Sequence, residues 1–144
     1  MEIYSRGTNR FENVELFKPK EPNEENLAFT LAPLLLTQIS GDTARSDLEN
    51  QFGALQPDGG GVRVEPSKPT VYFKPEAAVL NGKARATMTY FWFYPAEQSK
   101  ARPGPLSAQG IRITLDSSGK PVIWEVLSDP SHVDIIIVSQ SVET

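Results

Sequence analysis

The chain has 144 residues, a net charge of −4, no cysteine and a single histidine. It therefore forms no disulfide, thiolate metal site or iron–sulfur cluster, and no site that needs two imidazole groups. With 39% hydrophobic and 22% charged residues it has the composition of a globular protein, which predicts one domain and excludes a disordered or fibrous chain. We expect it to hold neither a metal ion nor a cofactor.

Residues 1–22 are mostly polar and end in KPKEP, so we expect a polar arm with at most one short strand, at residues 14–17. The chain does not begin with the basic and apolar regions of a signal peptide. Its longest apolar stretch, residues 27–39, is shorter than the roughly 20 residues that span a bilayer. These features predict a cytoplasmic protein without a membrane span, and they are also compatible with an exported protein whose leader has been removed.

Residues 23–55 carry a helical pattern. Asn23 is a suitable N-cap, and two glutamates follow it where the helix dipole favours negative charge. Leucine and isoleucine recur at helical spacing and make one apolar face, at residues 27, 31, 34, 35 and 39. Pro33 predicts a kink or two short helices, because proline removes a backbone hydrogen bond and its ring presses on the carbonyl of Phe29. We expect a further helical turn at residues 47–52.

Residues 56–61, QPDGGG, break this pattern, and the sequence after them alternates as strands do. Asn81-Gly82 predicts a tight hairpin turn, Gly119 a left-handed turn residue, and Pro75 a strand at a sheet edge. The last strand is apolar at four successive residues, so we expect both of its faces to be covered. The expected strands are residues 62–64, 70–73, 77–80, 83–94, 111–115, 121–127 and 133–138.

The order of these elements predicts the fold class. Short turns between strands imply antiparallel pairing, and an apolar helix face needs a sheet to pack against. We therefore expect an α+β fold, with an N-terminal helical region, kinked at Pro33, packed on a curved, mainly antiparallel sheet of five or six strands. The expected division is an arm, residues 1–22, and one domain, residues 23–144, made of a helical part (23–55), a glycine-rich break (56–61) and a sheet part (62–144). No motif identifies a family.

The run YFWFY at residues 90–94 is the most unusual feature of the sequence. Alternation along a strand puts Tyr90, Trp92 and Tyr94 on one face and two phenylalanines on the other. One aromatic face can join the core. The other is expected to be covered by the loop that follows, or to line a ligand pocket or a subunit interface, with Trp124 contributing if its strand lies alongside.

One stretch has the ingredients of acid–base catalysis: His132 lies near Asp129 and Asp134, and a carboxylate can orient an imidazole. The same residues also suit a plain turn before the last strand. Glu125, between apolar residues on one strand face, is a further acid candidate, and Arg112 on the neighbouring strand is its expected ion-pair partner. One histidine with two carboxylates predicts no metal site.

Charge is unevenly distributed along the chain, because residues 62–112 contain eight basic and three acidic residues while both flanking segments are acidic. Basic residues among aromatic ones can bind nucleic acid or acidic glycans. The net acidity of the chain disfavours nucleic acid, and the same residues suit solvent-facing strand positions. The candidates for such a surface are Arg63, Lys68, Lys74, Lys83 and Arg85.

The sequence thus favours a non-enzymatic binding or interaction domain, whose partner is a small ligand, another protein or a second copy of the chain. The expected pocket or interface residues are Tyr90, Trp92, Tyr94 and Trp124. One alternative is a small enzyme with a cone-shaped roll that uses His132 with Asp129 or Asp134, or Glu125. The other is a polyanion binder.

Overall fold

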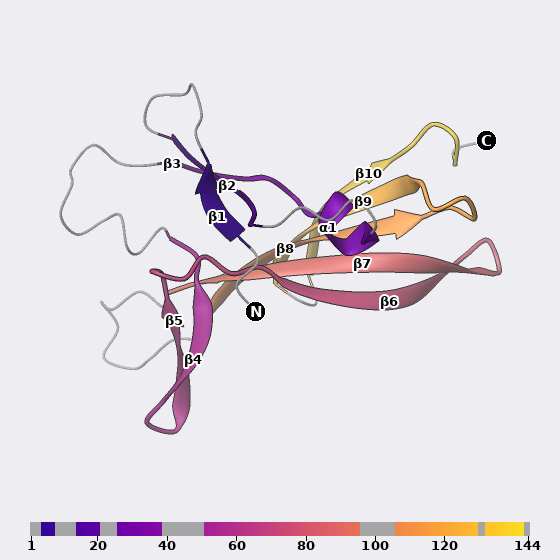
Figure 1. Ribbon diagram of the computed structural model, residues 1–144. Helices are drawn as coiled ribbons and strands as arrows, with labels where there is room; N and C mark the ends of the chain where they lie inside the picture. The colour runs from indigo at the N-terminus through magenta and orange to yellow at the C-terminus, as the bar shows by residue number, and fades with distance from the viewer. Residues whose placement is uncertain are drawn as a thin grey trace. The chain divides into compact units, whose positions relative to one another are not determined.

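The computed structural model describes residues 4–7, 14–20, 26–38, 51–95, 106–129 and 132–142. These residues form ten strands and one helix of four residues (Figure 1). The strands make three sheets, in the orders β1-β2-β3, β4-β5 and β10-β9-β8-β7-β6. The elements are β1 (Tyr4–Gly7), β2 (Val14–Pro19), α1 (Leu27–Thr30), β3 (Leu35–Gln38), β4 (Ala54–Asp58), β5 (Gly61–Glu65), β6 (Tyr72–Leu80), β7 (Lys83–Tyr94), β8 (Ser107–Leu115), β9 (Pro121–Asp129) and β10 (His132–Val138).

The chain divides into two compact units. The first comprises Met1–Tyr72 and Trp92–Ser107, and the second comprises Phe73–Phe91 and Ala108–Thr144. The first unit contains α1 and strands β1 to β5, and the second contains most of the five-stranded sheet. Strands β6, β7 and β8 belong to both, because the first residue of β6, the last three of β7 and the first of β8 fall in the first unit.

The expected α+β fold is wrong, since the described chain is mainly β and has no helical region across residues 23–55. Only α1 is helical there, and β3 and β4 occupy described parts of the same region. Residues 56–61 form a hairpin between β4 and β5, with the turn at Gly59 and Gly60, which both have positive φ. Asn23 and residues 39–50, which include most of the predicted turn at 47–52, lie outside the described residues.

Local chemistry explains why α1 is so short. Its N-cap is Asn26, whose Oδ1 accepts a hydrogen bond from the Ala28 amide at 3.0 Å. Pro33 has no N–H and disfavours helical backbone at the residue before it, so the helix ends at Thr30 instead of bending. The leucines after it extend into β3, which gains backbone hydrogen bonds from β2. Leu34, on the predicted apolar face, is 64% exposed.

Most predicted strands of residues 62–138 are confirmed, but the two expected at residues 70–73 and 77–80 form one strand, β6. Strand β7 has the predicted bounds, and the turn before it has φ of 51° at Asn81 and 72° at Gly82, as a type I′ turn requires. Gly119 has φ of 81° in the turn between β8 and β9. Pro75 lies in β6, an edge strand, where a missing N–H costs no sheet hydrogen bond.

An aromatic cluster forms the core of the first unit. Tyr4, Phe17 and Phe52 are each 1% exposed. The Phe52 ring meets the other two edge-on, with centroid distances of 6.2 Å to Tyr4 and 4.9 Å to Phe17. The Tyr4 hydroxyl donates a hydrogen bond to the Pro33 carbonyl. These buried side chains hold β1 and β2 against the segments that contain Pro33 and Phe52.

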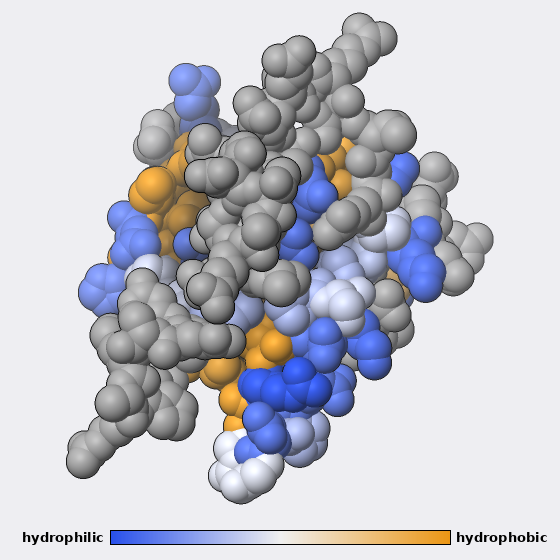
Figure 2. Space-filling model, turned by 90° about the vertical axis from the view of Figure 1, so that its left-hand side faces the viewer, coloured by the Kyte–Doolittle hydropathy of each residue, from blue (hydrophilic) through white to orange (hydrophobic). Residues whose placement is uncertain are grey.

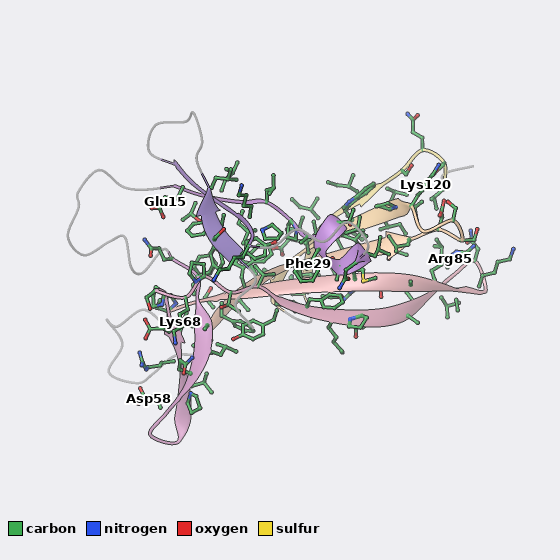
Figure 3. All side chains as sticks on the ribbon, in the orientation of Figure 1. Glu15, Phe29, Asp58, Lys68, Arg85 and Lys120 are labelled. Atoms are coloured by element: carbon green, nitrogen blue, oxygen red, sulfur yellow. The ribbon has the colours of Figure 1, made fainter. Side chains whose placement is uncertain are left out.

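The second unit is organised by antiparallel pairing across β8, β9 and β10. Arg112 lies opposite Glu125, and Glu125 lies opposite Ile136, so the three form one row across the sheet. The turns at the ends of β6 and β8 lie at the same end of this sheet, where Figure 3 labels Arg85 and Lys120. Its buried apolar side chains include Tyr90, Ile113, Leu115, Val122 and Leu127.

The expectation that both faces of the last strand are covered is wrong. Strand β10 is an edge strand, and Ile135, Ile136 and Ile137 are 55%, 61% and 55% exposed. A bulge at Asp134 shifts the register just before this run, between Val133 and Ile135. Within the described part of the chain, no helix is long and apolar enough to cross a membrane.

Candidate functional site

The aromatic residues singled out in the sequence are divided between the two units. Tyr90 is 2% exposed, and its ring lies 5.7 Å from that of Phe73. Trp92 Nε1 donates a hydrogen bond to the Tyr94 hydroxyl at 3.2 Å. Trp92 and Tyr94 belong to the first unit, whereas Tyr90 and the half-buried Trp124 belong to the second.

The chain itself supplies neighbours for the second aromatic face of β7. The Phe91 ring lies so close to Gly110 on β8 that a Cβ there would be 2.6 Å from Phe91 Cδ1. Phe93 meets Tyr72 edge-on, with centroids 5.6 Å apart, and the Tyr72 hydroxyl accepts a hydrogen bond from the Leu55 amide at 2.8 Å. Phe91 is thus packed within the second unit and Phe93 within the first.

Burial raises the pKa of Tyr90 to about 12. In the unfolded chain its phenol ionises near its ordinary value of about 10, so the unfolded state loses this proton first as the pH rises. We therefore expect the free energy of unfolding to fall between about pH 10 and pH 12, by roughly 3 kcal/mol from this group. Denaturant unfolding at several pH values tests it: Tyr90→Phe should remove this part of the slope, and an unchanged slope in that variant would contradict the assignment.

Two of the residues considered for acid–base catalysis, His132 and Asp134, lie at the surface. His132 is 70% exposed in its side chain and Asp134 46%, with 3.8 Å between His132 Nε2 and Asp134 Oδ1. Asp134 also accepts a hydrogen bond from the Ser128 hydroxyl. Asp129 ends β9 opposite His132 in the backbone register. A histidine that acts on a bound substrate in a cone-shaped roll would lie in a concavity, and this exposed position does not meet that requirement.

The candidate basic residues are also divided between the two units. Arg63 and Lys68 belong to the first unit, and Lys74, Lys83 and Arg85 to the second. Two of the five are paired with carboxylates on their own strands, Arg63 with Glu65 at 3.2 Å and Lys74 with Glu76 at 2.6 Å. Figure 3 shows Lys68 beside the β4–β5 hairpin and Arg85 near the turn between β6 and β7.

The second unit has a groove of about 420 Å³ on one face of its sheet. All five strands contribute to it, including both edge strands. None of its lining residues is aromatic. They are Glu76, Ala77, Ala78, Val79, Leu80, Thr87, Arg112, Thr114, Ile123, Glu125 and Ile136.

A row of alternating charges crosses this groove. Arg112 Nη1 lies 3.2 Å and 3.4 Å from the two carboxylate oxygens of Glu125, which confirms the pair predicted from the sequence. Glu76 accepts hydrogen bonds from Lys74 and from the Thr89 hydroxyl, and these bonds lower its pKa, with a smaller contribution from the positive charge of Arg112. Both carboxylates that line the groove are thus already paired with a base.

Sequence reasoning found Arg112 and Glu125 but missed Glu76, Thr87 and Thr114 as parts of the same groove. The first two face each other across one hairpin, so short-range register is enough to pair them. Glu76 comes from the edge strand β6, two strands away from β8. Alternation along β7 does place Thr87 on one face of the strand. It does not predict the sheet curvature that makes this face concave.

The outer edge of β10 is the second notable feature of this unit. Exposed apolar side chains are common one at a time, and Figure 2 shows hydrophobic patches separated by hydrophilic side chains on the face that it draws. In β10 they are consecutive, at residues 135–138, and appear on both faces of the strand. Among the described residues no strand pairs with this edge.

Comparison of the chain with protein-family models, curated proteins and solved structures gives no match.

Proposed function

We propose that this chain is a non-enzymatic interaction domain that associates with a second copy of itself through the outer edge of β10. The observation that carries the proposal is the run of four exposed apolar side chains, from 37% to 61% exposed, on that strand. An edge strand offers a row of N–H and C=O groups that another extended chain can pair with. Contiguous exposed apolar surface is typical of interaction sites.

The opposite edge of the same sheet is protected in the usual ways. Strand β6 carries two charged residues, Lys74 and Glu76, and between them Pro75, which offers no N–H. Strand β10 has none of these features across residues 135–138. The sheet therefore has one edge that resists strand addition and one that permits it.

A second copy is the partner that the charges favour. In a two-fold symmetric contact the residues near the axis lie close to their own counterparts, so charged side chains there would repel each other. Residues 135–142 contain no charged side chain. If two β10 strands pair antiparallel about a point between Ile136 and Ile137, each Asp134 lies opposite an uncharged Ser139. The paired side chains of residues 135–138 are then all β-branched, a combination that stabilises cross-strand contacts.

Ile137→Lys tests this pairing. Light scattering during size-exclusion chromatography should give the wild-type chain twice its monomer mass of 15.9 kDa and the variant the monomer mass. Lysine opposes pairing because it would bring two like charges together at the symmetric edge. Ile137 is 55% exposed, so the substitution should leave the fold intact, which circular dichroism checks.

Val79→Lys is the matched control, because Val79 is an even more exposed apolar residue, 77%, on the protected edge strand β6. It should leave the dimer unchanged. A monomeric wild-type chain, a dimer that survives Ile137→Lys, or polydisperse aggregation in place of a defined dimer would each overturn the proposal.

A further inference from the structure

Two buried hydroxyls in the groove make no hydrogen bond within the described part of the chain. Four buried residues of the described chain are polar, and all are threonines. Thr70 donates to the Lys68 carbonyl and Thr89 to Glu76. Thr87 and Thr114, 2% and 4% exposed, have no side-chain hydrogen bond to any residue that the structure describes, and both line the groove. Buried polar groups are rarely left unpaired, so these two need an explanation.

Arg112 adds unused donors to the same groove. A guanidinium has five N–H groups, and the bonds to Glu125 use only Nη1. The arginine side chain is 29% exposed where it lines the groove. The groove therefore offers spare donors from Arg112 and two hydroxyls, between aliphatic side chains such as Val79, Ile123 and Ile136.

The charges of the groove select against ionic ligands. An anion attracted to Arg112 would meet the carboxylates of Glu76 and Glu125 around a single guanidinium. A cation would find both carboxylates already paired, Glu76 with Lys74 and Glu125 with Arg112. The hydrogen-bond donors that remain available in the groove can still bond to an uncharged oxygen atom.

We infer that the groove is a binding site for a small neutral amphiphile, with an aliphatic chain against the apolar walls and an amide, ester or hydroxyl oxygen accepting hydrogen bonds from Thr87, Thr114 and Arg112. Its volume falls in the range of small-molecule pockets. The site lies within the second unit and does not depend on the pairing of β10, because no partner copy supplies any part of it.

Three probes of one chain length test the head-group chemistry: octanamide, octanoate and octylammonium. Titration of the full chain, followed by calorimetry and by NMR shifts of its backbone amides, should show octanamide binding at least about tenfold more tightly than either ion, a difference of about 1.4 kcal/mol. Equal affinity for all three probes, or no binding of octanamide, would overturn the inference, the first because the head group would then play no part.

Thr114→Val tests the hydroxyl itself, since valine has nearly the same shape. It should weaken octanamide binding by roughly three- to tenfold and leave octanoate unaffected, the loss expected for one hydrogen bond. Thr114→Ser, which keeps the hydroxyl, should bind as the wild type does. Thr87→Val repeats the test at the other hydroxyl, and Thr70→Val, outside the groove, is the control that should bind normally. Wild-type octanamide affinity in both valine variants of the groove would refute the site.

Discussion

Gly110→Ala is expected to destabilise the protein by about 3 kcal/mol, at the upper end of the cost of overpacking. A Cβ at this position would lie 2.6 Å from the backbone oxygen of Tyr90 and 2.6 Å from Cδ1 of Phe91. The Phe91 ring can turn, but the Tyr90 carbonyl belongs to β7 and moves only with that strand. Denaturant unfolding followed by circular dichroism measures the loss.

Gly61→Ala is the matched control for this prediction. The added Cβ would meet only the Asp58 carbonyl, at an ordinary contact distance of 3.5 Å. Its effect should stay within about 0.5 kcal/mol, as for most surface substitutions. If alanine at 110 were tolerated as well as alanine at 61, the close approach of β7 and β8 at this point would be wrong. If Gly110→Ala lowers the free energy of unfolding and leaves the denaturant m-value unchanged, the loss comes from packing. An unchanged m-value means that the variant exposes the same surface area on unfolding as the wild type.

Phe52→Ala is expected to cost about 3–5 kcal/mol, the usual range for truncating a fully buried phenylalanine. Phe52 is 1% exposed and is the ring that contacts both Tyr4 and Phe17, so its removal leaves a cavity lined by two aromatic edges. These three residues come from distant parts of the first unit, which depends on their contact. Urea unfolding curves give the change in free energy.

Phe73→Ala provides the comparison for Phe52→Ala. Phe73 is 39% exposed, and its ring lies tilted against the ring of Tyr90. Truncation of Phe73 therefore opens little cavity and should cost about 1 kcal/mol. Equal losses in the two variants would show that Phe52 is not the centre of a packed cluster. A loss confined to Phe52→Ala supports an aromatic core that includes Tyr4 and Phe17, two residues of the segment that the sequence predicts to be a polar arm.

The sequence predicted strands most reliably where turn chemistry and alternation agree. Asn81-Gly82 and Gly119 each tolerate positive φ, and on either side of them the apolar residues alternate, so β7, β8 and β9 could be located from local features alone. The Arg112–Glu125 pair followed from the hairpin that contains both residues. The helical region failed because leucine spacing suggested an apolar face, while Pro33 stopped the helix and β2 offered the leucines of β3 a strand partner.

The sequence by itself determined the turns, the bounds of β7, the absence of disulfide chemistry and the cross-strand ion pair, because each depends on residues close together in the chain or on composition alone. Only the tertiary structure decided which strands are edges, and therefore that the apolar run of β10 is exposed and not covered. It also decided that Thr87 and Thr114 are buried beside Glu76 and Arg112 in one groove. Strand order and sheet curvature depend on contacts between residues far apart in sequence, and alternation records only which face of its own strand a residue occupies.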